Sequence, residues 1–237
     1  MNKKQMDSPN SGHLNKMVLF SAVVIGVMFL LAAWAWVQIP EGAQIPVHWG
    51  LNGTADRYGG KFEGLLLPPL ITLGIALLMA VIPRLDPRGE NIARSPQAYK
   101  AIWVGILLFM LAIHAIAILA ALGWSVNIGR IVGSMVGILF IVLGNYMGKI
   151  RSNYTMGIRT PWTLASELSW NKTHRLGGKL FVTLGVLVVI VALLGQSALT
   201  FYIMISGLLI TVIAVFAYSY VVWKNDPANG VNHTTAS

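Results

Sequence analysis

Residues 180–223 read LFVTLGVLVVIVALLGQSALTFYIMISGLLITVIAVFAYSYVVW, a run of 44 residues that contains no charged side chain. An α-helix needs roughly 20 apolar residues to cross a bilayer core of about 30 Å, so this run is long enough to cross twice. Gly195, Gln196 and Ser197 interrupt it near the middle and predict the turn between the two crossings. We therefore predict that this run forms two transmembrane helices.

Four shorter runs without charged residues precede this one, and each fits a single crossing: residues 17–37, 65–82, 101–127 and 131–148. The 237-residue chain is 56% hydrophobic and 11% charged, whereas soluble domains carry about 25% charged residues. These observations predict an all-α integral membrane protein with six transmembrane helices. The first run has 21 residues. Because a signal-peptide core has about 7 to 15, we interpret this run as a retained helix.

The basic residues orient the helices, because short cytoplasmic loops of membrane proteins collect Lys and Arg. With a cytoplasmic N-terminus, 14 of the 17 basic residues fall in cytoplasmic segments, and only Arg57, Lys61 and Arg130 fall outside. Both termini are therefore predicted to be cytoplasmic. The net charge of +9 is then explained by topology and by anionic membrane lipids, and we expect no direct nucleic-acid binding. The chain has no cysteine, which excludes disulfides and thiolate chemistry.

The predicted organisation has two polar tails, two helical regions and a connector. In order, these are a cytoplasmic tail (1–16), helices 1 and 2 (17–82) with an extracytoplasmic loop (38–63), a cytoplasmic connector (83–100), a four-helix region (101–223) with a cytoplasmic motif segment (149–179), and a second tail (224–237). We interpret the connector as a plain link. In the third helix, His114 is expected to bond a neighbouring helix. Glycines 129, 133, 137 and 144 lie on one side of the fourth helix. They predict close helix contact, within the monomer or in a homodimer.

The predicted external loop, QIPEGAQIPVHWGLNGTADRYGGKFEG (38–64), is rich in residues that favour turns. Its Asn-Gly pair at 52–53 predicts a small hairpin over residues 47–58. Two interpretations stay open. The loop recognises a ligand through side chains such as His48 and Asp56, or it is an ordered cap. In the cap, these two satisfy each other and Trp49 anchors at the lipid headgroups.

The predicted inner segment, GNYMGKIRSNYTMGIRTPWTLASELSWNKTHRLGGK (144–179), is unusually polar and aromatic for a membrane linker. Thr160 as a cap and Pro161 at the first helical position predict a helix that continues until Gly177. We expect this helix to lie along the membrane surface, anchored by Trp162 and Trp170.

Glu167 and His174 share a face of this helix, because they are seven residues apart. A carboxylate and an imidazole can hold zinc, so a membrane-embedded metal-dependent hydrolase is one alternative. Two ligands fall short of the three that a catalytic zinc usually has, so we expect no enzyme, no catalytic residue and no cofactor. A small-molecule or peptide transporter is a second alternative, although the spans offer almost no charge for ion coupling. A purely structural account pairs Arg151, Arg159 and Arg175 with Glu167 and with phospholipids.

Together the two polar segments resemble the SdpI-like family of bacterial membrane immunity proteins, with its associated N-terminal membrane domain of the IPxHWG type. The external hallmark matches at Pro46, His48, Trp49, Asp56 and Lys61. The internal hallmark matches at Asn145, Arg151, Asn153, Arg159, Thr160, Pro161, Trp162, Glu167, Trp170, Thr173, His174 and Arg175. At Ser152 the chain departs from the proline that is common in the family.

This resemblance implies a multi-pass protein of the bacterial cytoplasmic membrane that confers tolerance to a secreted peptide toxin. It also implies, for some members, capture of a soluble DNA-binding repressor at the membrane. We expect the outer loop to recognise the toxin. Inside, we expect a polar network of Arg159, Glu167, His174 and Arg175.

Overall fold

The computed structural model describes residues 11–228. The chain divides into two compact units: the hairpin unit, Met1–Val81 with Trp103–Val132, and the motif unit, Ile82–Ile102 with Gly133–Ser237. Residues 1–10 and 229–237, which make up most of the two predicted tails, lie outside the described part.

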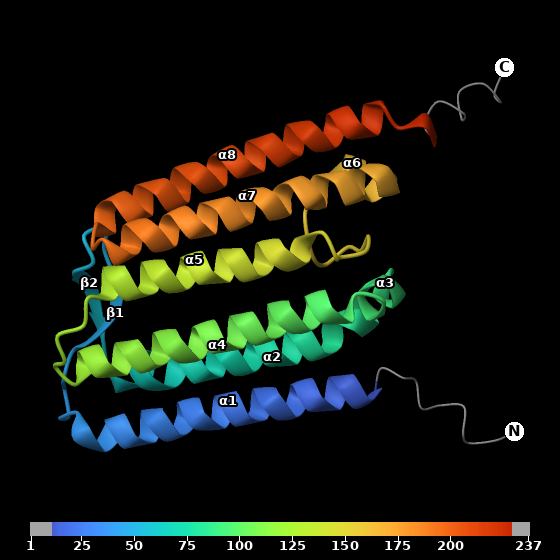
Figure 1. Ribbon diagram of the computed structural model, residues 1–237. Helices are drawn as coiled ribbons and strands as arrows, with labels where there is room; N and C mark the ends of the chain where they lie inside the picture. The colour runs from blue at the N-terminus through green and yellow to red at the C-terminus, as the bar shows by residue number, and fades with distance from the viewer. Residues whose placement is uncertain (1–10, 229–237) are drawn as a thin grey trace, which may run out of the picture. The chain divides into compact units, whose positions relative to one another are not determined.

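Within residues 11–228, six helices are long and apolar enough to cross a membrane, as predicted. They are formed by α1 (Ser11–Gln38), η2 (Phe62–Leu66) continuing into α2 (Leu67–Leu85), α4 (Pro96–Ala121), α5 (Ile128–Met147), α7 (Glu167–Leu193) and α8 (Ser197–Lys224), as Figure 1 shows. Two short helices, α3 (Gly89–Ala93) and α6 (Pro161–Ala165), lie in the polar segments. The first helix begins at Ser11, six residues before the predicted start.

The hairpin unit packs a small β-hairpin onto the ends of its helices. Strands β1 (Ile45–Trp49) and β2 (Ala55–Gly59) pair antiparallel, so the predicted hairpin extends slightly further at both ends. Its turn contains Gly53 at φ 78, a conformation that glycine adopts without a steric penalty. Ile45 is 1% exposed and joins a core cluster with Ala32, Leu65 and Ile118, which come from α1, η2 and α4. This apolar contact fixes the hairpin against its helices.

His114 lies inside this unit and is fully buried. Its Nε2 is 3.3 Å from the carbonyl oxygen of Met28 in α1, which is the kind of interhelical bond that its position predicted. The bond ties α4 to α1.

In the motif unit, α5, α7 and α8 lie side by side (Figure 1). The glycines of α5 contact α7: a Cβ on Gly137 would meet the backbone of Gly185, and a Cβ on Gly144 would meet that of Gly178. Two helix backbones approach this closely only where both carry small residues. The glycine face predicted on the fourth helix is therefore used within the chain, and it needs no homodimer to explain it.

The predicted surface helix from Thr160 to Gly177 is wrong, because two helices divide this segment. Ser166 is extended (φ −138, ψ 121), ends α6, and caps α7 by accepting a hydrogen bond from Ser169 N–H. Nor does Gly177 end the second helix, which continues to Leu193. A Cβ on Gly177 would meet Ile158 and Met147, so the helix packs closely there. The fifth span thus begins at Glu167, and its 27 residues correspond to about 40 Å, longer than a bilayer core.

Candidate functional site

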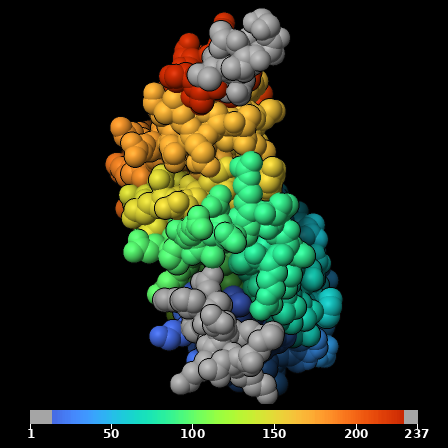
Figure 2. Space-filling view, turned by 90° about the vertical axis from the view of Figure 1, so that its right-hand side faces the viewer, coloured from blue at the N-terminus to red at the C-terminus, as the bar shows by residue number. Residues whose placement is uncertain are grey.

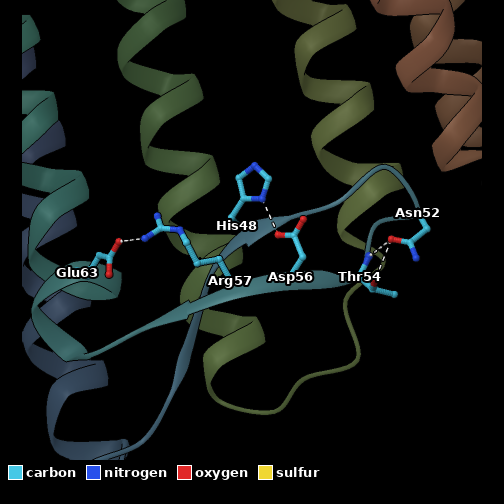
Figure 3. Close-up of polar contacts among 6 residues, drawn as sticks. All are labelled: His48, Asn52, Thr54, Asp56, Arg57 and Glu63. Carbon is cyan, nitrogen blue, oxygen red and sulfur yellow. Dashed lines mark hydrogen bonds and ion pairs between the residues drawn. The ribbon is translucent and has the colours of Figure 1, made fainter.

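The exposed face of the hairpin carries two polar side-chain pairs, one between an imidazole and a carboxylate and one between a guanidinium and a carboxylate (Figure 3). His48 of β1 and Asp56 of β2 point toward each other, with Nδ1 and Oδ1 2.5 Å apart. Arg57 of β2 pairs with Glu63 in η2. The His48 and Arg57 side chains are 64% and 60% exposed. Exposed pairs contribute only about 0–1 kcal/mol to stability, so a ligand can displace them at little cost.

Lys61 has a different position from the other predicted recognition residues. Its side chain is 9% exposed, and its Nζ donates to the carbonyl oxygen of Trp36 (3.0 Å) and pairs with Glu41 (2.8 Å). It therefore ties the end of α1 to the beginning of η2. Pro46 and Trp49 are half-buried in β1.

In the motif unit, residues 149–160 connect α5 to α6; we call them the motif loop. Asn153 lies at its centre and is fully buried. Its Oδ1 accepts from the backbone N–H groups of Thr155 (2.9 Å) and Met156 (2.6 Å), while its Nδ2 donates to the carbonyl oxygen of Arg151 (2.8 Å). A buried polar group without a partner costs about 1–3 kcal/mol. Because another backbone conformation would break the three bonds of the Asn153 amide, this side chain stabilises the observed conformation of the loop.

His174 reaches this loop from α7 and uses both of its ring nitrogens. Nε2 accepts from Ile158 N–H (2.9 Å), which requires the proton on Nδ1, and Nδ1 donates to the carbonyl oxygen of Trp170 (2.8 Å). The His174 imidazole stacks on the Trp170 indole, with ring centroids 4.0 Å apart. Trp170 Nε1 donates to the carbonyl oxygen of Ile150 (2.7 Å). Both side chains are fully buried. Trp170 therefore joins α7 to the motif loop and is not the interfacial anchor that we predicted.

The connector is not a plain link, because it is bonded to the motif loop. Asp86 is buried, and its Oδ2 accepts from Tyr154 N–H (2.9 Å) and from the Thr155 hydroxyl. Its Oδ1 accepts from Arg88 N–H (2.7 Å). One carboxylate thus organises its own turn and holds a loop almost 70 residues further along the chain.

Three more connector residues strengthen this attachment. Arg88 donates to the Ser152 hydroxyl and to the carbonyl oxygen of Leu164 (3.2 Å). Asn91 donates to the carbonyl oxygen of Ser152 (2.7 Å), and the Ser95 hydroxyl accepts from Arg151 N–H (3.0 Å). The serine that departs from the common proline of the family is therefore a bonding partner of the connector. Figure 2 faces this end of the motif unit, where the connector surface lies against that of residues 149–166.

On its other side the motif loop is fixed to α8. Thr160 caps α6 in a reciprocal capping box with Thr163, and its hydroxyl donates to the Ser219 hydroxyl (3.0 Å). Trp162 packs edge-on against Phe216 and Tyr220, with ring centroids 4.8 and 5.2 Å away. Thr160 and Trp162 thus join two helices that are far apart in sequence.

The polar network predicted from four inner side chains does not form. Arg159, Glu167 and Arg175 are exposed, and within residues 11–228 no ion pair joins them, whereas His174 has only backbone hydrogen-bond partners. Glu167 is the first residue of α7, where the helix dipole favours a carboxylate without a basic partner. Since both nitrogens of His174 are occupied, the zinc hydrolase alternative lacks its imidazole ligand.

The remaining predicted residues divide by exposure. Asn145 and Pro161 are exposed, and Thr173 is fully buried with no partner for its hydroxyl in the described part.

Sequence reasoning missed Asp86, Arg88, Asn91 and Ser219. A local signal was available for the first two, because Asp-Pro-Arg-Gly at 86–89 is typical of a turn in which the Asp side chain accepts a hydrogen bond two residues on. Nothing local indicates that the same carboxylate reaches Thr155.

The six apolar helices, the hairpin and the motif loop define a multi-pass membrane protein with two ordered polar surfaces, one on each unit.

Two family models match the chain. Residues 149–221 match the SdpI/YfhL protein family, and residues 23–73 match a domain of unknown function, DUF1648. The chain is 28% identical over 208 residues to the Immunity protein SdpI of Bacillus subtilis (strain 168), which covers 85% of this chain and 94% of that protein. It is 26% identical over 74 residues to an uncharacterized protein of Archaeoglobus fulgidus, covering 31% of this chain and 39% of that protein. No solved structure matches.

The first match contains the whole motif loop, all of α7 and nearly all of α8, and the second contains the hairpin. The chain is accordingly similar to the SdpI family in its motif segment, and the predicted resemblance of its two polar segments is confirmed. Together with the six apolar helices, this similarity supports a multi-pass bacterial membrane protein.

Proposed function

We propose that this chain is an immunity protein of the bacterial membrane, which makes its cell tolerant of a secreted peptide toxin. The observation that carries the proposal is the match to the Immunity protein SdpI, because it runs through 85% of this chain and 94% of that protein. A match of this extent includes far more than a shared membrane-spanning pattern.

In this proposal the hairpin lies outside the cell, as the distribution of basic residues predicts, and there it contacts the toxin. Support comes from the exposed pair of His48 and Asp56, which presents an imidazole and a carboxylate on a hairpin fixed by Ile45. Trp49 and Tyr58 add amphipathic surface, of the kind that supplies binding energy in protein interfaces.

The motif loop would then act on the cytoplasmic side, where it would hold a soluble DNA-binding repressor once toxin is bound. Its support is a rigid frame with an exposed outer surface: Asn153 fixes the backbone, while Arg151, Tyr154 and Arg159 are exposed. Such a frame presents side chains without an ordering cost when a partner binds.

The test is survival of toxin-sensitive cells that express this chain, challenged with a panel of secreted membrane-active peptides. We expect protection against at least one peptide and loss of most of it in the His48→Ala, Asp56→Ala double variant. A matched control is Glu90→Gln, Arg94→Gln, which removes another exposed ion pair, in α3 and its C-cap. Absence of protection across the panel, with normal protein levels in the membrane, contradicts the proposal. The repressor arm is tested separately by purifying the chain with its soluble partners, with and without the protective peptide.

A further inference from the structure

Two arginines of the motif unit contact the same residue, Tyr154, from different segments of the chain. The Arg88 guanidinium lies 4.8 Å from the centroid of the Tyr154 ring, and Arg159 Nη1 donates to the Tyr154 carbonyl oxygen. In the described part of the chain, neither arginine forms an ion pair with a carboxylate. Asp86 is close by, but its oxygens accept from backbone N–H groups and from Thr155. Among the described residues, the two positive charges therefore have no ion-pair partner.

The arginines also keep unused hydrogen-bond donors. A guanidinium has five N–H groups in a rigid plane. Arg88 uses two of its nitrogens, on Ser152 and Leu164, and Arg159 uses one, on Tyr154. These bonds hold the guanidinium groups in place before any ligand arrives. A fixed guanidinium matches the oxygens of a phosphate in a bidentate way, which a lysine ammonium does not.

The position of the two arginines relative to the membrane surface indicates whether the phosphate belongs to a lipid headgroup or is free in solution. Thr160, next to Arg159, bonds Ser219 of α8, and Trp162 packs on Tyr220 in the next position. Tyr220 also contacts Trp223, one residue before α8 ends at Lys224. Trp and Tyr gather at the headgroup level of membrane proteins, so these rings mark the level at which lipid phosphates lie.

We propose that Arg88 and Arg159, which both contact Tyr154, form a binding site for the phosphate group of an anionic phospholipid. The ligand chemistry is a phosphate anion, and the depth of the aromatic rings assigns it to a lipid headgroup and not to free phosphate. Zwitterionic lipids fit less well, because their own cationic group competes with the arginines. The site goes beyond the proposed immunity function. It shares Tyr154 and Arg159 with the surface proposed for the repressor, but lipid binding is tested without toxin or repressor and so does not depend on that proposal.

The test uses the full chain in nanodiscs made from equal parts of phosphatidylglycerol and phosphatidylcholine. Native mass spectrometry counts the phospholipids of each kind that stay bound. We expect the native chain to retain phosphatidylglycerol preferentially, and the Arg88→Gln, Arg159→Gln variant to reduce this preference by roughly threefold to tenfold. The Arg84→Gln, Arg94→Gln control removes the same charge from the same unit and is expected to keep the preference. Arg159→Gln alone, which breaks one hydrogen bond, is included in case the double variant does not fold.

Three outcomes overturn the assignment. An equal loss in the control pair shows diffuse charge attraction without a site. The absence of any preference in the native chain excludes an anionic-lipid site. In a parallel arm, inorganic phosphate is titrated onto the chain in a neutral detergent. If it binds with the same dependence on the two arginines while phosphatidylglycerol shows none, the site is one for a free anion. A loss of preference that is confined to the Arg88 and Arg159 variants supports the proposal.

Discussion

Both ring nitrogens of His174 are bonded to backbone groups. One nitrogen accepts from Ile158 and the other donates to Trp170, so a single tautomer is fixed. The ring lies against Gly157, whose φ of 98 is a conformation that other residues rarely adopt. The glycine and the histidine are thus explained together, since one provides the space that the other fills.

Gly157→Ala is therefore expected to destabilise the protein. The new Cβ would meet the His174 imidazole, and the backbone would be strained at a cost of about 1–3 kcal/mol. A lower apparent melting temperature in detergent measures this effect. Gly148→Ala is the matched control near the same segment, because its Cβ would make only an ordinary contact, 3.5 Å from Arg175 Cγ. Equal melting temperatures for the two variants would show that the close fit around His174 is not real.

Among the elements, α7 does two things in one continuous helix. Its first turns hold the motif loop through Trp170 and His174, and its later turns pack against α5 through Gly178 and Gly185. Since no break separates these parts, α7 connects the motif loop rigidly to α5.

Glycine-to-alanine substitutions test this packing, and their signs should differ with position. Gly178→Ala places a Cβ against the Gly144 carbonyl oxygen, so we expect the helices to separate and the melting temperature to fall. Gly74→Ala in α2 meets nothing within 4 Å in the described part of the chain. There the gain in helix propensity, about 0.5–1 kcal/mol, should leave stability unchanged or raised. A fall of the same size in both variants would contradict the close contact of α5 and α7.

How far the sequence predicts these elements depends on the range of the interactions involved. The six spans follow from runs of apolar residues, and the hairpin follows from Asn-Gly within a segment rich in turn-forming residues, so both could be predicted locally. The division at Ser166 could not, because Thr160 and Ser166 are both acceptable caps and only tertiary contacts decide that both are used. The bond from Asp86 to Thr155 joins segments almost 70 residues apart, and no local pattern records it.

For the whole molecule, the structure constrains which polar segments share a side of the membrane. The connector and the motif loop bond directly, so they lie on one side, as the distribution of basic residues requires. This agreement does not depend on which side is cytoplasmic. The absolute orientation decides whether the hairpin can meet a secreted peptide at all.

Orientation can be measured cleanly, because the chain has no cysteine of its own. We expect a single cysteine at Thr54→Cys, on the exposed hairpin, to react with a membrane-impermeant maleimide in intact cells. Lys172→Cys, on the exposed side of α7 near the motif loop, is expected to react only after the membrane is permeabilised. We expect this orientation because the opposite one would place 14 of the 17 basic residues outside the cell, against the charge rule for short loops. The reverse labelling pattern would place the hairpin in the cytoplasm and remove the physical basis for toxin recognition by His48 and Asp56.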